Sequence, residues 1–203
     1  MGFGFRHWGL RLVVLLWGTI AMADAGNSKL PKITVLVNNS AGVSPRVLRK
    51  AEFDAGQIFH AAGVAIEWED CQSGAVVDVC RRVPGANQIV FVLHLVPTGR
   101  TSTDSVFGVA FLGEGGIGRY CNVFFDRVEE IERESGTGAA HLLGAVVAHE
   151  LGHLLLGSHA HAHAGIMTPT WQEQSLRAIE MGTFFFTREQ SAFMRAQLQP
   201  VNH

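Results

Sequence analysis

The sequence has no surplus of charge of either sign. Asp, Glu, Lys and Arg make up 17% of its 203 residues, and the formal net charge is −2. Without a basic surplus the chain lacks the electrostatic footprint of a nucleic-acid-binding protein, and nothing draws it to an anionic membrane surface. We therefore expect neither nucleic acid nor a membrane surface as a partner. The 47% of hydrophobic residues argues against disorder and suits a domain with a substantial core.

Signatures of several enzyme mechanisms are missing as well. There is no G-x-S-x-G motif and no Cys/His pair placed for nucleophilic catalysis, which argues against serine and cysteine mechanisms. The Gly-rich segment 107–118 has no Lys-Ser/Thr ending and no helix pattern directly after it, so it is not a phosphate-binding loop. No internal repeat divides residues 26–203, and we expect one domain there.

Residues 1–25 have the form of a signal peptide. Basic residues precede an apolar run at residues 12–20, and small residues suited to cleavage follow it. The alternative is a membrane anchor, but even the longer stretch of residues 10–23, about 14 residues, is shorter than the ~20 that span a bilayer. No Cys follows the run, which argues against a lipid anchor. We therefore expect cleavage, no membrane span afterwards, and a secreted or periplasmic bacterial protein.

Export would place the three cysteines in an oxidising compartment. Cys71 and Cys80 flank a short polar loop and are the expected disulfide. Cys121 would then be a buried free thiol, although its pairing with either of the other two cysteines stays open.

Hydrophobic patterning predicts an α+β fold. The strand-like segments are 33–37, 64–68, 88–96 and 120–125, and the helix-like segments are 45–62, 126–133, 139–156 and 187–199. The third strand is apolar almost throughout and should lie centrally in the sheet. Capping residues support three of the helices: Ser44 before Pro45, Asp126, and the T-x-x-Q box from Thr187 to Gln190.

The most informative stretch is H-E-x-x-H at residues 149–153. On a helix, His149 and His153 lie on one face and can bind a single ion, while Glu150 lies beside that ion. The surrounding helix, 139–156, is apolar on nearly every side and is therefore expected to be buried. Two histidines and a glutamate in such a helix need partners, because burying them unpaired is costly. A zinc site satisfies this need.

The motif and its surroundings resemble the metzincin clan of zinc metalloproteases, whose H-E-x-x-H-x-x-G-x-x-H pattern is followed by a Met-turn. Here Gly165-Ile166-Met167 follows the motif. Residues 44–68, 113–119 and 165–167 look like a group of secreted bacterial metzincin-like proteins. The resemblance implies a mixed, twisted sheet of four to five strands with a backing helix, a buried active-site helix, a Met-turn at Met167 and a C-terminal helix.

The sequence departs from the clan at one position. The clan's glycine falls at Leu156, whereas Gly157 comes one residue later. A helix longer by one residue carries the chain ~1.5 Å further and rotates it ~100°, so the return to the ion should need more residues. This favours His161 as the third ligand, and the similar bacterial group also has its histidine there. His159 keeps the clan's spacing and stays the alternative, with His163 third.

The resemblance implies a zinc-dependent endopeptidase acting on peptide or protein substrates, which we expect to be a monomer. His149, His153 and either His161 or His159 would bind Zn²⁺, and Glu150 would take the proton of an activated water. In the clan an edge strand pairs with extended substrate, which would place that strand within residues 108–124. The alternative is an exported zinc-buffering protein that uses its His-rich loop without catalysis.

Overall fold

The computed structural model describes Met1 and residues 30–71, 88–98, 106–113, 116, 118–157 and 160–199. The proposed signal peptide and Cys80 lie outside these residues, so cleavage, export and the Cys71–Cys80 disulfide stay predictions. Within the described residues Cys121 is a free thiol on a buried strand, as expected, and none of its side chain reaches solvent.

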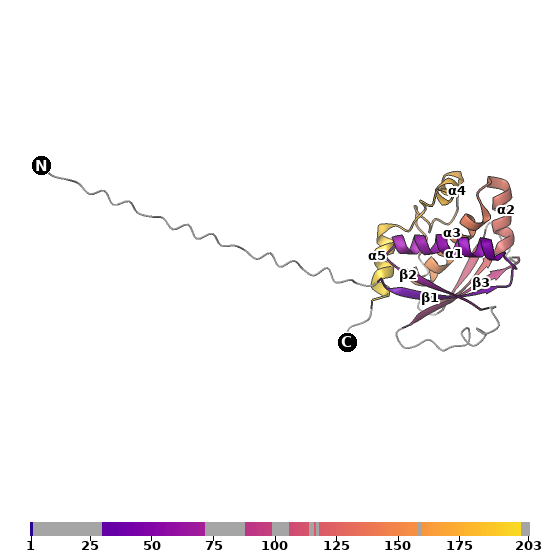
Figure 1. Cartoon of the computed structure of the whole chain (residues 1–203), viewed down its shortest axis with the longest axis horizontal. Coiled ribbons are helices and arrows are strands. Elements are labelled where there is room, and N and C mark those ends of the chain that lie inside the picture. The colour runs from indigo at the N-terminus through magenta and orange to yellow at the C-terminus, as the bar shows by residue number, and fades with distance from the viewer. Residues whose placement is uncertain are drawn as a thin grey trace.

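A five-stranded mixed sheet forms the base of the fold (Figure 1). Its strands are β1 (Lys32–Asn39), β2 (Ala65–Asp70), β3 (Ile89–Val96), β4 (Gly108–Leu112) and β5 (Gly118–Phe124). They lie in the order β2-β1-β3-β5-β4. β4 at one edge is antiparallel to β5, and the other pairs are parallel. The apolar strand β3 is central, which confirms the prediction.

Hydrophobic patterning does not predict the edge strand β4, although the resemblance to the clan places an edge strand within residues 108–124, where β4 lies. Its five residues lie at the start of the Gly-rich segment, and glycine is depleted in strands. Its sequence, GVAFL, has no polar residue, so it lacks the apolar/polar alternation that predicts a half-buried strand. β4 therefore owes its structure to pairing with β5 rather than to local propensity.

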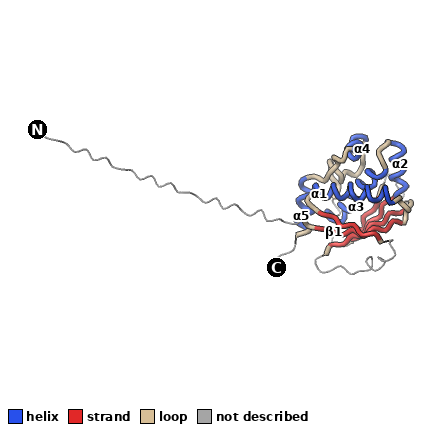
Figure 2. The backbone as a smooth tube through the Cα atoms, viewed as in Figure 1, coloured by secondary structure: helices blue, strands red, loops and turns tan. Residues whose placement is uncertain are grey.

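Five helices complete the described fold. They are α1 (Pro45–Ala61), α2 (Phe125–Ser135), α3 (Ala139–Leu156), α4 (Glu173–Glu180) and α5 (Arg188–Gln197). All lie on the same side of the sheet (Figure 2). Alternate residues of the inner strands point to these helices and form the core with them, among them Ile33, Val35, Val37, Phe91, Leu93 and Leu95.

The capping predictions are confirmed for α1 and α5 and wrong for α2. The Ser44 hydroxyl accepts a hydrogen bond from the Val47 N–H. Thr187 and Gln190 form the reciprocal capping box. Asp126 does not cap α2, because β5 runs directly into that helix and Phe124 occupies the cap position. The Asp126 carboxylate instead accepts from the N–H of the next residue.

Helix α3 runs through the core between α1 and the β4–β5 edge of the sheet. It packs closely on α1 at Gly144, where an added Cβ would lie 2.8 Å from the Ala51 carbonyl oxygen. Among the described helices, only α3 is long and apolar enough to cross a membrane, but 61% of its residues are buried inside the protein. Its apolar composition is therefore explained by its place in the core.

Candidate metal centre

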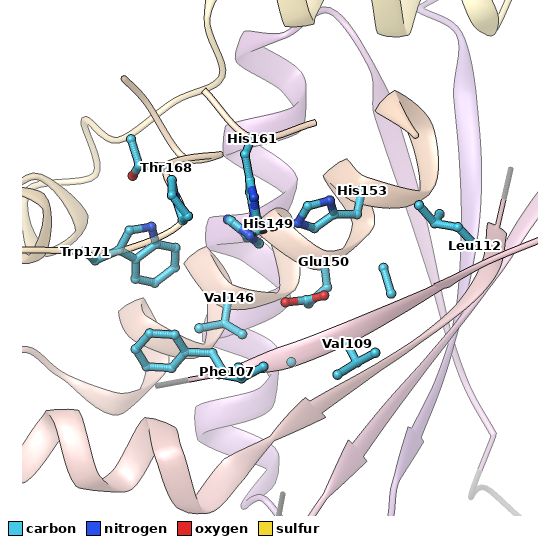
Figure 3. A pocket seen from close by; sticks show the side chains of 14 residues that line it. Phe107, Val109, Leu112, Val146, His149, Glu150, His153, His161, Thr168 and Trp171 are labelled. Carbon is cyan, nitrogen blue, oxygen red and sulfur yellow. Dashed lines mark hydrogen bonds between the residues drawn. The ribbon is translucent and has the colours of Figure 1, made fainter. Parts of the chain in front are cut away.

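Three histidines meet beside the C-terminal half of α3. His149 and His153 come from the helix and His161 from the segment after it, and one ring nitrogen of each lies within 4.8 Å of the others. The Nε2 atoms of His149 and His153 are 3.1 Å apart. In Figure 3 the His161 ring faces both of them. Three imidazole nitrogens at one point can hold a metal ion and leave a fourth coordination position open.

The turn at Gly157 brings His161 back to the helix. Gly157 caps α3 with φ 81° and ψ −163°, a conformation that is essentially restricted to glycine. After it, the buried Ala160 is held by a hydrogen bond from the Gln190 side chain to its carbonyl oxygen, at 3.0 Å. His161 follows at once. His159 lies outside the described residues, and the exposed His163 is not part of the cluster.

His149 is oriented by the turn that carries Met167. Its Nδ1–H donates to the Ile166 carbonyl at 2.8 Å, which leaves Nε2 free for an ion. The Ile166 N–H in turn donates to the Phe185 carbonyl at 2.9 Å. A ligand histidine whose second nitrogen is bonded to a fixed carbonyl has one tautomer and one ring orientation. The turn therefore prepares His149 to bind metal.

Met167 is completely buried beneath this part of α3. An added Cβ on Gly152, which lies between the two helix histidines in sequence, would be 2.6 Å from the Met167 sulfur. The thioether thus fills the space that the missing side chain leaves. Its assignment as a Met-turn rests on the resemblance to the clan.

Burial sets the protonation of the site. It raises the pKa of Glu150 to about 8. It also lowers the pKa of both His149 and His153 to about 4, so these imidazoles are neutral at pH 7, which is the form that binds metal. A dication held by the histidines would favour the Glu150 carboxylate.

The histidines and Glu150 open into a cavity of about 270 Å³ between β4, α3 and the Met167 turn. Phe107 and Trp171 stack with ring centroids 5.3 Å apart, and the Trp171 ring also lies 5.9 Å from that of His149. Figure 3 shows both aromatic rings on one side of the cavity, near Val146. Of the described residues lining this cavity, only Glu150 and the three histidines are ionisable. The remaining wall is largely apolar.

The outer edge of β4 borders the cavity. The Phe124 N–H donates to the Phe107 carbonyl, so Phe107 faces β5. Because hydrogen-bonding direction alternates along an antiparallel strand, the backbone groups of Gly108 and Ala110 face outward. In the described part of the chain, no strand pairs with this edge.

Tyr120 and His94 do not contribute to the site. Tyr120 lies outside the cavity lining, and its hydroxyl is 2.8 Å from Nδ1 of His94 on β3.

Several residues that line the cavity could not be identified as site residues from the sequence. Gly108, Phe107 and Trp171 have roles that follow only from contacts across the fold.

No family model and no curated protein matches the chain. Among solved structures, archaemetzincin from Methanopyrus kandleri is similar, with a TM-score of 0.52 and 17% sequence identity, and the match covers 83% of this chain and 96% of that chain. The fold is similar to that of archaemetzincin. At this identity the likeness shows the fold, an α+β arrangement with a mixed five-stranded sheet. The cluster of His149, His153 and His161 in this chain could hold a metal ion.

Proposed function

We propose that the protein is an exported zinc-dependent endopeptidase that acts on peptide or protein substrates as a monomer. The observation that carries this proposal is the convergence of three histidines beside a buried glutamate in a cavity bordered by an edge strand. The metzincin-like fold supports it. The signal-like sequence of residues 1–25 is the basis for export.

His149, His153 and His161 would hold the zinc through neutral imidazole nitrogens. The Ile166 carbonyl fixes the His149 ring for this task, and Met167 packs beneath the helix that carries two of the ligands. Zinc bound there supplies Lewis-acid chemistry, polarising a peptide carbonyl and making a water molecule more acidic. The donor set fits this ion, since all three ligands are nitrogen atoms.

Glu150 is the general base of the proposed reaction. Its carboxylate accepts a proton from the attacking water and passes that proton to the amine nitrogen that leaves. The apolar surroundings that raise its pKa also exclude bulk water, which strengthens electrostatic interactions inside the cavity.

The edge of β4 would bind the substrate backbone. An extended peptide can add to an exposed sheet edge through main-chain hydrogen bonds. The groups available for such bonds are those of Gly108 and Ala110, whose N–H and C=O face outward. This arrangement would lay the peptide across the cavity beside Glu150.

The decisive experiment is to measure metal content and hydrolysis on the same purified mature protein. We expect about one tightly bound zinc, cleavage of a fluorescence-quenched peptide mixture, loss of cleavage with a chelator, and recovery with zinc. A zinc-buffering protein would instead take up several ions weakly and cleave nothing. That outcome would replace the peptidase proposal.

Replacing Trp171 with alanine should weaken selection for apolar side chains next to the cleaved bond. The ring forms one wall of the cavity with Phe107, and its removal deletes a large apolar surface. We expect kcat/KM on peptides with apolar residues to fall about 10- to 100-fold, with zinc content unchanged. Phe53→Ala, which removes an exposed aromatic ring outside this cavity, is the matched control. If kcat/KM fell equally for peptides with apolar and with polar residues, Trp171 would not be the wall that selects apolar side chains.

A further inference from the structure

Gly108, the first residue of β4, lies directly against Glu150. A Cβ added to Gly108 would be 2.7 Å from both Cγ and Cδ of Glu150, and 2.6 Å from the backbone oxygen of Asn122. Such distances are far inside van der Waals contact, which begins near 3.5 Å between carbon atoms. Any side chain at this position would have to displace the Glu150 carboxyl group, the strand, or both.

The need for glycine at this position is one of space rather than backbone conformation. Seven described glycines have a positive φ, and Gly108 is not among them. Other residues could therefore adopt its backbone angles. Because Gly108 has no side chain, the edge strand can approach α3 closely at the helical turn that carries Glu150.

Packing is also what holds the Glu150 carboxyl group in place. No described residue donates a hydrogen bond to it, although Glu150 is buried, with only 5% of the residue exposed. A catalytic base must be held close to its productive geometry by its neighbours. Gly108 and the helix provide that confinement from two sides.

We propose that Gly108 is a positioning residue, whose lack of a side chain seats the Glu150 carboxyl group between α3 and the edge of the sheet. The catalytic consequence rests on the proposed peptidase function. The steric coupling of Gly108 and Glu150 does not, and it can be measured on the folded protein without any substrate.

A double-mutant cycle in thermal unfolding tests the coupling. Gly108→Ala should lower the melting temperature by roughly 6 °C in the wild-type background, as expected for overpacking. In the Glu150→Ala background the cost should fall to roughly half, because Cγ and Cδ are gone and only the Asn122 contact remains. An equal cost in both backgrounds would overturn the proposal.

Gly118→Ala is the matched control for the cycle. Its added Cβ would lie 2.8 Å from Leu154 Cδ2 and closer still to the Phe111 carbonyl oxygen, in the same pair of strands but away from Glu150. Its cost should be the same with and without Glu150. If Gly108→Ala does not fold, rescue by Glu150→Ala supports the proposal. If the double variant also fails to fold, the need for glycine at position 108 comes from the contact with the Asn122 backbone, and the proposal is overturned.

Ligand binding to the zinc-loaded protein gives a second readout. Acetohydroxamate can bind zinc and share its hydroxyl proton with a neighbouring carboxylate, whereas azide can bind zinc alone. Gly108→Ala should weaken acetohydroxamate binding about 10-fold, the loss of a hydrogen bond to a charged group, and leave azide binding within twofold. Equal effects on both ligands would contradict a positioning role. Absence of peptide cleavage would count against the proposed function only.

Discussion

Replacing Glu150 with glutamine is expected to lower kcat by about 10²- to 10⁴-fold, the usual contribution of a general base. Glutamine has the same shape and fills the same space against Gly108, but its amide cannot accept the proton of the attacking water. The three histidines are untouched, so zinc content should stay at one per chain. Steady-state kinetics on a quenched peptide, together with metal analysis, measures both effects.

The control for this variant is Glu173→Gln, which makes the same chemical change at an exposed residue of α4 that does not line the cavity. It should leave kcat unchanged. A Glu150→Gln protein that keeps more than a tenth of the wild-type kcat would show that another group moves the proton. Loss of zinc in this variant would mean that Glu150 belongs to the ligand set.

Elements encoded by neighbouring residues are predictable from this sequence. The bounds of α3 agree with its apolar run, and the caps of α1 and α5 are formed by the side chains that the sequence indicates. In each case the interacting groups lie within one helical turn of each other. A pattern read along the chain therefore contains the whole interaction.

Elements that depend on distant partners are not predictable in this way. β4 forms because β5 pairs with it, and α2 begins without a capping side chain because a strand feeds directly into it. The same division applies to the site. His149 and His153 follow from helical spacing, whereas Gly108 and Trp171 reach it from separate segments of the chain.

The choice between His161 and His159 lies between these two cases. The late glycine predicts a longer return path, and Gly157 does end α3 with a positive φ. What places the next residues is the distant Gln190 side chain, whose amide holds the Ala160 carbonyl. The capping-box pattern predicts the helix whose first turn contains Gln190, but nothing local links that residue to Ala160.

Replacing His161 with alanine is expected to weaken zinc binding by more than about 100-fold, since even outer-shell partners of metal ligands contribute about 10- to 100-fold. The change removes one of three converging nitrogens, and a two-histidine site cannot complete a tetrahedral set without extra water. Competition with a chromophoric chelator measures the affinity. The fold should survive, because His161 is exposed and its neighbour Ala160 keeps the anchor to Gln190.

His163→Ala is the matched control, because it removes an exposed histidine two residues away that lies outside the cluster. It should change zinc affinity by less than threefold, and His159→Ala should do the same. If His159→Ala abolished tight binding while His161→Ala did not, the clan's spacing would hold in spite of the late Gly157. Equal, small losses for all three variants would point to loose metal uptake by a His-rich loop. A large loss confined to His161→Ala would tie the ligand set to the turn that Gly157 makes.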